Sequence, residues 1–121
     1  VTGDNVWLDE LGEHHSYAYN ILVNGQVAKK KGIKDGDIVR LETEAGDGVE
    51  GKIKVTETVH PEVVGIAGVF GHWAKALPTA RGKGVHYQNL FPVDLDLDRL
   101  DMITGAVDCC MKVNILKVSR A

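Results

Sequence analysis

The sequence predicts a single, mainly β domain that closes into a small barrel. Three observations support this prediction. Five or six short strand-like runs recur at regular spacing, and only one short helix and one long glycine-punctuated loop interrupt them. The length of 121 residues is that of one domain, so residues 1–121 form one unit. The hydrophobic fraction of 44% is sufficient for a globular core.

The N-terminal third begins without a clear pattern. Residues 1–12 are acidic and irregular, and their only apolar anchors are Trp7, Leu8 and Leu11. The run 17–23 is rich in tyrosine and branched residues, so it predicts the first strand.

A short helix follows this strand. Asn24 is a suitable N-cap, and residues 26–31 make about two turns. Gly32 stands just past the end, where a left-handed conformation is needed, and Ile33 can pack back on the helix. The three lysines 29–31 lie in the last turn, at the negative end of the helix dipole, so we interpret them as a solvated helix end.

The remaining elements are strands. A turn at 34–37 precedes a strand at 38–44, in which Val39 and Leu41 face a core. A hairpin turn at 45–48 leads into a strand at 49–56, in which Ile53 and Val55 face inward. A strand at 62–67 and a loop at 65–84 follow. The last strand covers about 108–118, and its apolar residues are Met111, Val113, Ile115 and Leu116.

Composition excludes several classes of function. Seventeen acidic residues against fourteen basic ones give a net charge of −3, which does not favour nucleic-acid binding. No apolar run is long enough to span a membrane, and the acidic N-terminus does not resemble a signal peptide. Cys109 and Cys110 are neighbours, so a disulfide between them would be strained; we expect buried or half-buried thiols and no metal site.

Four segments together carry a resemblance to a known family. They are Asn24–Val39, with its Gly32-Ile33-Lys34-Asp35-Gly36-Asp37 turn, then His60–Val64, Gly71-His72-Trp73, and Gly82–Leu90. In this order they resemble the C-terminal molybdopterin-dinucleotide-binding domain of the dimethyl-sulfoxide-reductase family of molybdenum and tungsten oxidoreductases. The resemblance extends from about residue 15 to residue 118. It implies a closed six-stranded double-psi β-barrel with one or two short helices. Gly25 departs from the family, which usually has proline there.

The resemblance also implies a set of cofactor-binding residues. In the family, a His-Ser pair lies against the pterin, a Gly-rich loop approaches the cofactor, and an amide side chain near the last loop bonds the pterin. The matching residues here are His15, Ser16, Gly71, His72, Trp73, Lys83, His86, Gln88 and Asn89. Gln88 replaces the usual asparagine, and Glu10 and Glu13 stand where a basic residue is common.

Some of these residues also have a structural interpretation. His15 could lie in an ordinary polar loop, and Trp73 could plug one end of the barrel instead of shielding a ligand. Tyr87 fits either a core or a lid position, and Lys83 and Arg81 could simply be solvated.

The function implied is that of a cofactor clamp. The chain would cover the pterin side of a molybdenum or tungsten bis(molybdopterin guanine dinucleotide) cofactor, which supplies the redox chemistry. The metal ligand would lie in other domains or subunits, its expected partners, so we predict no catalytic residue and no independent activity. The start at Val1 fits an excised C-terminal domain of a larger catalytic subunit better than a separate small subunit. A signal outside the chain would decide between the cytoplasm and the periplasm.

The sequence leaves two alternative functions. Double-psi barrels of AAA-type ATPases carry a similar Gly-Ile-x-Asp-Gly-Asp turn and bind partner proteins, but they have no evident use for the 71–73 and 82–90 loops. A free-standing enzyme is the third possibility. Aspartate decarboxylase has this class of barrel but matures at a Gly-Ser bond, which is absent here. The five histidines show no nucleophile–base pattern either.

Overall fold

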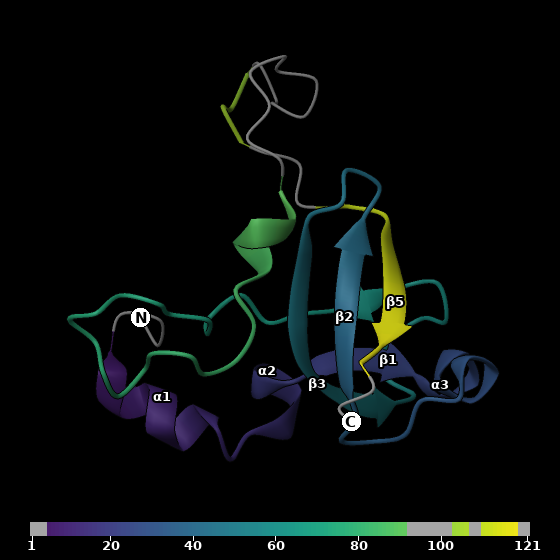
Figure 1. Cartoon of the computed structure of the whole chain (residues 1–121), viewed down its shortest axis with the longest axis horizontal. Coiled ribbons are helices and arrows are strands. Elements are labelled where there is room, and N and C mark those ends of the chain that lie inside the picture. The colour runs from purple at the N-terminus through teal and green to yellow at the C-terminus, as the bar shows by residue number, and fades with distance from the viewer. Residues whose placement is uncertain (1–4, 92–102, 107–109, 119–121) are drawn as a thin grey trace.

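The computed structural model describes residues 5–91, 103–106 and 110–118. This part of the chain is mainly β, as predicted. Its strands form one sheet in the order β4-β1-β3-β2-β5, and the sheet curls around the core (Figure 1). The strands are β1 (Ile21–Asn24), β2 (Ile38–Thr43), β3 (Gly48–Thr56), β4 (Val64–Gly65) and β5 (Val113–Lys117). The six-stranded closed barrel is not seen in the described residues, whose sheet has five strands and is open.

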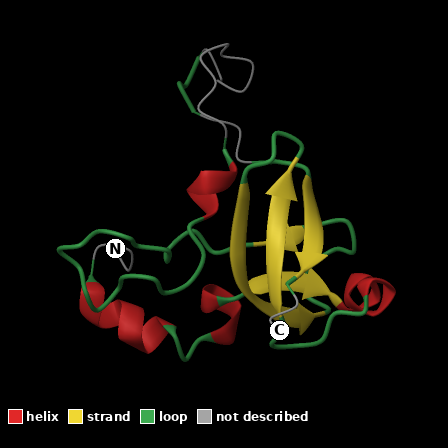
Figure 2. Ribbon diagram, viewed as in Figure 1, coloured by secondary structure: helices red, strands yellow, loops and turns green. Residues whose placement is uncertain are grey.

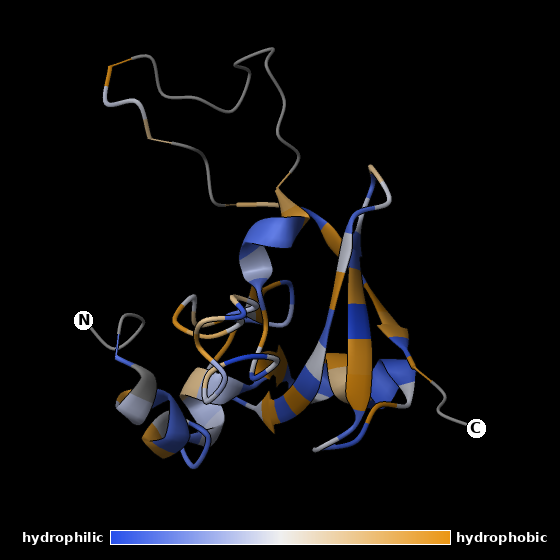
Figure 3. Ribbon diagram, turned by 60° about the vertical axis from the view of Figure 1, so that its left-hand side comes forward, coloured by the Kyte–Doolittle hydropathy of each residue, from blue (hydrophilic) through white to orange (hydrophobic). Residues whose placement is uncertain are grey.

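The long strand β3 joins the two parts of the sheet. Its first half pairs antiparallel with β2, and its second half pairs parallel with β1. Along β2, Val39 and Leu41 are fully buried, as their alternation predicts. The same alternation appears as orange and blue bands along the strands in Figure 3. Ile53 of β3 is buried as predicted, while Val55 is only half-buried.

The helix α3 (Gly25–Lys31) and the turn after it confirm the sequence prediction closely. The Asn24 side chain accepts a hydrogen bond from the Gln26 N–H at 2.9 Å. Gly32 has a φ of 65°, and the Ile33 N–H donates back to the Ala28 carbonyl at 2.9 Å. In the following turn, the Asp37 carboxylate accepts from the Lys34 N–H at 2.9 Å.

The N-terminal prediction is wrong in two places. Residues 6–12, predicted irregular, form α1 (Val6–Gly12), and the predicted strand at 17–23 begins with the helical turn α2 (Ser16–Tyr19). Local caps explain both helices, because the Asn5 side chain accepts from the Trp7 N–H and the His15 imidazole accepts from the Ala18 N–H. With α3 and the 3-10 helix η2 (Tyr87–Leu90), the described residues exceed the one or two helices predicted (Figure 2).

Two strands are shorter than predicted. Strand β4 keeps two residues of 62–67, and β5 covers only part of 108–118. In β5, Ile115 is buried but Leu116 is 45% exposed. Cys110 lies before β5 and is exposed, so its predicted burial is wrong; Cys109 lies outside the described residues.

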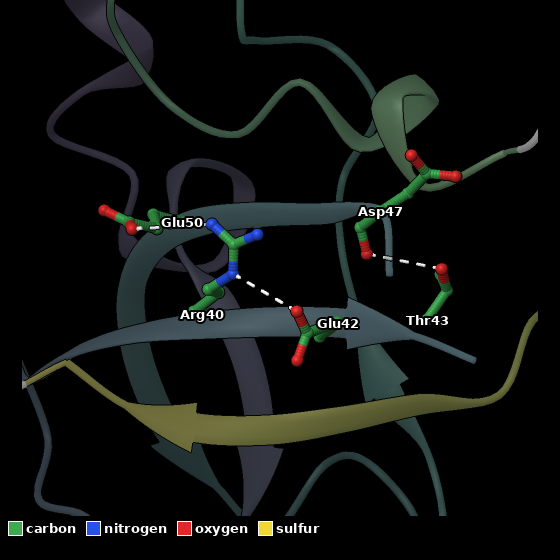
Figure 4. Close-up of polar contacts among 5 residues, drawn as sticks. All are labelled: Arg40, Glu42, Thr43, Asp47 and Glu50. Carbon is green, nitrogen blue, oxygen red and sulfur yellow. Dashed lines mark hydrogen bonds and ion pairs between the residues drawn. The ribbon is translucent and has the colours of Figure 1, made fainter. Parts of the chain in front are cut away.

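The outer face of the β2–β3 hairpin is polar (Figure 4). Arg40 lies between two carboxylates, with its Nε 3.8 Å from Glu42 and an Nη 3.9 Å from Glu50. At the turn, the Thr43 hydroxyl donates to the Asp47 carbonyl at 3.3 Å. Exposed pairs of this kind contribute little to stability.

The core lies inside the curl of the sheet. Residues that do not belong to the strands also contribute side chains to it. Its buried members are Ile21, Val23, Ile33, Val39, Leu41, Val49, Ile53, Val85, Leu90 and Ile115. Val85 and Leu90 come from the loop region that the resemblance marks as ligand-binding, and both are at most 5% exposed. The core therefore anchors that region directly. None of the described helices is both long and apolar enough to cross a membrane.

Candidate functional site

Two of the predicted ligand loops lie side by side. The Gly71 N–H donates to the Lys83 carbonyl at 2.8 Å, and the Gly82 N–H donates to the His72 carbonyl at 2.9 Å. These bonds flank a parallel bridge between His72 and Arg81. The backbone thus joins two motifs that are separated in sequence, as a common site requires.

Gly71 makes this close approach possible. Its φ is 95°, and a Cβ at this position would lie 2.4 Å from the His86 Cα. Only glycine combines this backbone conformation with such a short separation. The 71–73 loop is therefore pressed against the segment that leads into η2.

A pocket of about 240 Å³ opens between these segments. Its lining residues are Gly68, Val69, Phe70, His72, His86, Tyr87 and Gln88. Three of the predicted cofactor-binding side chains therefore line one pocket. Tyr87 lines the same pocket and packs edge-on against Phe91 at 5.6 Å, so it is part of the pocket wall. Asn89 is exposed and does not line the pocket.

Trp73 lies at the outside of the 71–73 loop. It is 62% exposed, so the interpretation of this residue as a barrel-end plug is wrong. Its ring lies over Gly82, where a Cβ would be 4.0 Å away. A large indole left in solvent beside a pocket is available for stacking or shielding.

His15 and Ser16 are not brought to this pocket. The His15 Nδ1 accepts the Ala18 N–H at 3.3 Å, so the residue starts α2 rather than lying in a loop. His15 is exposed and Ser16 is half-buried, and neither lines the pocket.

Helix α1 contacts the ligand loops, which was not predicted from the sequence. Residues 9, 12 and 13 share one helix face by their spacing. Asp9 lies 4.0 Å from the His72 Nε2, and Glu13 lies 2.6 Å from the Lys83 Nζ. A Cβ on Gly12 would overlap the Phe70 ring, so the helix backbone packs closely on that ring. The capping Asn5 was a signal for the helix itself, although not for its partner.

Lys83 is therefore already paired. Its hydrogen bond to Glu13, with the nearby charges of Glu13 and Glu10, raises the pKa of Lys83 above its ordinary value. Glu10 and Glu13 are the same acids that stand where the family often has a basic residue. A phosphate contact by Lys83 would have to compete with Glu13.

No cluster of three or more metal-ligating side chains exists within residues 5–91, 103–106 and 110–118. The site instead offers imidazoles, an amide, backbone groups and aromatic surface. Such groups suit a polar heterocycle, because each of its edges needs donors and acceptors in fixed places.

Comparison with known proteins agrees with these features. A family model described as "Molydopterin dinucleotide binding domain" matches residues 2–96. The thiosulfate reductase molybdopterin-containing subunit PhsA of Salmonella typhimurium is 38% identical over 72 residues. That match covers 60% of this chain but only 9% of the subunit, so the chain spans a small part of its relative. Because the family match extends over most of the chain, this protein belongs to the molybdopterin dinucleotide-binding domain family.

Proposed function

We propose that the chain covers the pterin side of a molybdenum or tungsten bis(molybdopterin guanine dinucleotide) cofactor within a molybdopterin-dependent oxidoreductase. The observation that carries this proposal is the joining of the 71–73 and 82–88 loops around one pocket. The family membership identifies the ligand class, and the pocket would receive one part of that ligand.

The residues of the pocket fit a pterin edge. His72 and His86 can each donate or accept a hydrogen bond, and the exposed amide of Gln88 can do both at once. Phe70 and Tyr87 supply aromatic surface for the flat ring. A pocket of about 240 Å³ is smaller than a whole dinucleotide, which suits a domain that covers one side of its cofactor.

The cofactor, when bound, supplies the redox chemistry, and this chain positions and shields it. The remaining predicted contacts would lie outside the pocket. Trp73 would shield the ring from water, and Asn89, His15 and Ser16 would contact the cofactor outside the pocket. We further propose that the curled sheet belongs to a closed double-psi barrel with a sixth strand. Other domains or subunits of the parent enzyme would hold the metal.

The test uses the parent enzyme with Gln88→Ala and, separately, Trp73→Ala. We expect both variants to lose part of their bound metal and pterin while the domain stays folded, because both side chains are exposed near the pocket. Metal content is measured by mass spectrometry, and pterin by fluorescence after oxidation. Gln26→Ala is the matched control, because Gln26 is an exposed glutamine on α3, away from the pocket.

Cofactor content equal to that of the wild type in both variants would contradict the proposal. In that case the protein-interaction barrel would become the better explanation. Capture of a partner protein that depends on Trp73, in an enzyme with full cofactor content, would support that explanation.

A further inference from the structure

Helix α1 buries a carboxylate against the ligand loops without giving it a full set of partners. Asp9 is 2% exposed, and its Oδ1 has no hydrogen-bond partner among the described residues. Its other oxygen, Oδ2, lies 4.0 Å from the His72 Nε2. Burial of an unpaired carboxylate is costly, so this position demands a compensating donor.

His72 is the complementary group. Its Nε2 is also buried and has no hydrogen-bond partner in the described part of the chain. The side chain as a whole is 31% exposed, and the residue lines the pocket. A buried acceptor therefore faces a buried nitrogen that can donate. Of the two ring nitrogens, Nε2 is the one that lies 4.0 Å from the Asp9 carboxylate.

We propose that Asp9 is a positioning residue that holds His72 as its Nε2–H tautomer. A carboxylate only accepts hydrogen bonds, so the imidazole nitrogen that faces it must carry the hydrogen. In a neutral imidazole the other nitrogen is then an acceptor. His72 thus presents Nδ1 to the pocket as an acceptor for an N–H on the edge of a ligand heterocycle, rather than as a donor to a phosphate. This step rests on the proposed function and specifies which edge of the pterin this corner of the pocket takes.

The first experiment needs no ligand. The tautomers of the histidines are read from two-bond ¹H–¹⁵N correlation spectra of the labelled 121-residue chain at mildly alkaline pH. His15 and His60 are internal references, because their Nδ1 atoms accept backbone N–H groups at 3.3 and 3.2 Å and so leave hydrogen on Nε2. We expect His72 to match them and its Nε2–H to exchange slowly with water.

Asp9→Leu removes the acceptor and keeps a similar volume. We expect fast exchange of the His72 Nε2–H in this variant and unchanged signals from His15 and His60. Asp9→Asn, which keeps the shape, should accelerate exchange to a lesser degree, because a neutral acceptor forms a weaker bond than a carboxylate; it serves as the test if the leucine variant does not fold. Hydrogen on Nδ1 of the wild-type His72, or unchanged exchange in both variants, would overturn the proposal.

The second experiment uses pterin and an N-methylated pterin that lacks the ring amide N–H. We expect the wild-type chain to bind pterin about tenfold more tightly, which is the effect of roughly one hydrogen bond. The ratio should approach one in His72→Ala and in Asp9→Leu. A ratio that persists in His72→Ala would overturn the predicted contact. If the tautomer is as expected but neither compound binds, the role of Asp9 stands and the pterin site is refuted.

Discussion

Two regions of this molecule are held together by different kinds of contact. In the scaffold region, residues 21–56, strands β1, β2 and β3 pair in register over most of their length. Its core side chains are among the least exposed in the described residues, with Leu41 at 0% and Ile53 at 1%. Regular ladders and buried apolar area therefore determine its shape.

The ligand region, residues 68–90 with α1, contributes Val85 and Leu90 to the core but has few such contacts elsewhere. Its loops meet through two backbone hydrogen bonds, a single bridge and side chains from a helix far away in sequence. Glycines at positive φ set the close approaches. We therefore expect changes to the buried side chains of the scaffold to impair folding, whereas the ligand region can lose its arrangement while the fold survives.

The largest effect should come from the scaffold core. Leu41→Ala removes a fully buried side chain from strand β2, which pairs with β3 on one side and β5 on the other, and we expect a loss of about 2–5 kcal/mol of unfolding free energy. Urea unfolding followed by circular dichroism measures this loss. The matched control is Leu116→Ala on the neighbouring strand β5, where the side chain is 45% exposed. Equal losses in the two variants would show that β2 is not the centre of the core.

A smaller effect on stability but a larger one on the site is expected at Gly71. In Gly71→Ala the new Cβ would lie 2.4 Å from the His86 Cα, so the 71–73 loop must move away from the pocket. Gly82→Ala is the control, because its φ is also positive, at 76°, but the nearest atom to a Cβ is 4.0 Å away. The control variant should lose only about 1–2 kcal/mol of unfolding free energy, which is the cost of the left-handed backbone conformation for alanine.

Amide chemical shifts and cofactor content of the parent enzyme separate these two glycine variants. We expect shifts at His86 and Gln88 and loss of cofactor in Gly71→Ala, with neither change in Gly82→Ala. The same response in both variants would mean that positive φ alone, and not the close approach to His86, sets the loop.

The same division explains which parts of the molecule the sequence could predict. The helix cap at Asn24, the left-handed Gly32 and the inward Val39 depend on neighbours within a few residues, and all three are as predicted. The helical turn α2 was missed because a histidine cap outweighed the β propensity of Tyr17 and Tyr19.

The candidate site was predictable only in part. The motifs identified the loops that carry His72, His86 and Gln88, and the structure brings these residues to one pocket. The contacts of α1 could not be read from the sequence, because Asp9 and His72 are 63 positions apart and nothing local links them. A long-range pair of this kind becomes visible only when the fold is known.

The smallest expected effects on stability come from charged side chains. They depend on pH in opposite directions in the two regions. In the scaffold, the hydrogen bond from the Val55 N–H, at 2.7 Å, and the nearby Lys54 lower the pKa of Asp35 below its ordinary 3.8. A lowered pKa means that the folded state favours the charged form. The contribution of Asp35 is therefore complete above pH 3.8 and is lost as the pH falls through the folded-state value.

Lys83 in the ligand region has the opposite behaviour. The Glu13 carboxylate raises its pKa above the ordinary 10.5, so its contribution is complete below pH 10.5 and is lost as the pH rises through the folded-state value. Thermal melts across the pH range, with Asp35→Asn and Lys83→Met for comparison, test both signs. We expect Asp35→Asn to melt at a slightly lower temperature than the wild type, and this difference should vanish in acid. The corresponding difference for Lys83→Met should vanish in alkali. In each case the wild type has lost the same interaction at that extreme of pH. A Lys83→Met deficit that persists at high pH would contradict this prediction, because the stability lost in the variant would then not come from the ion pair with Glu13.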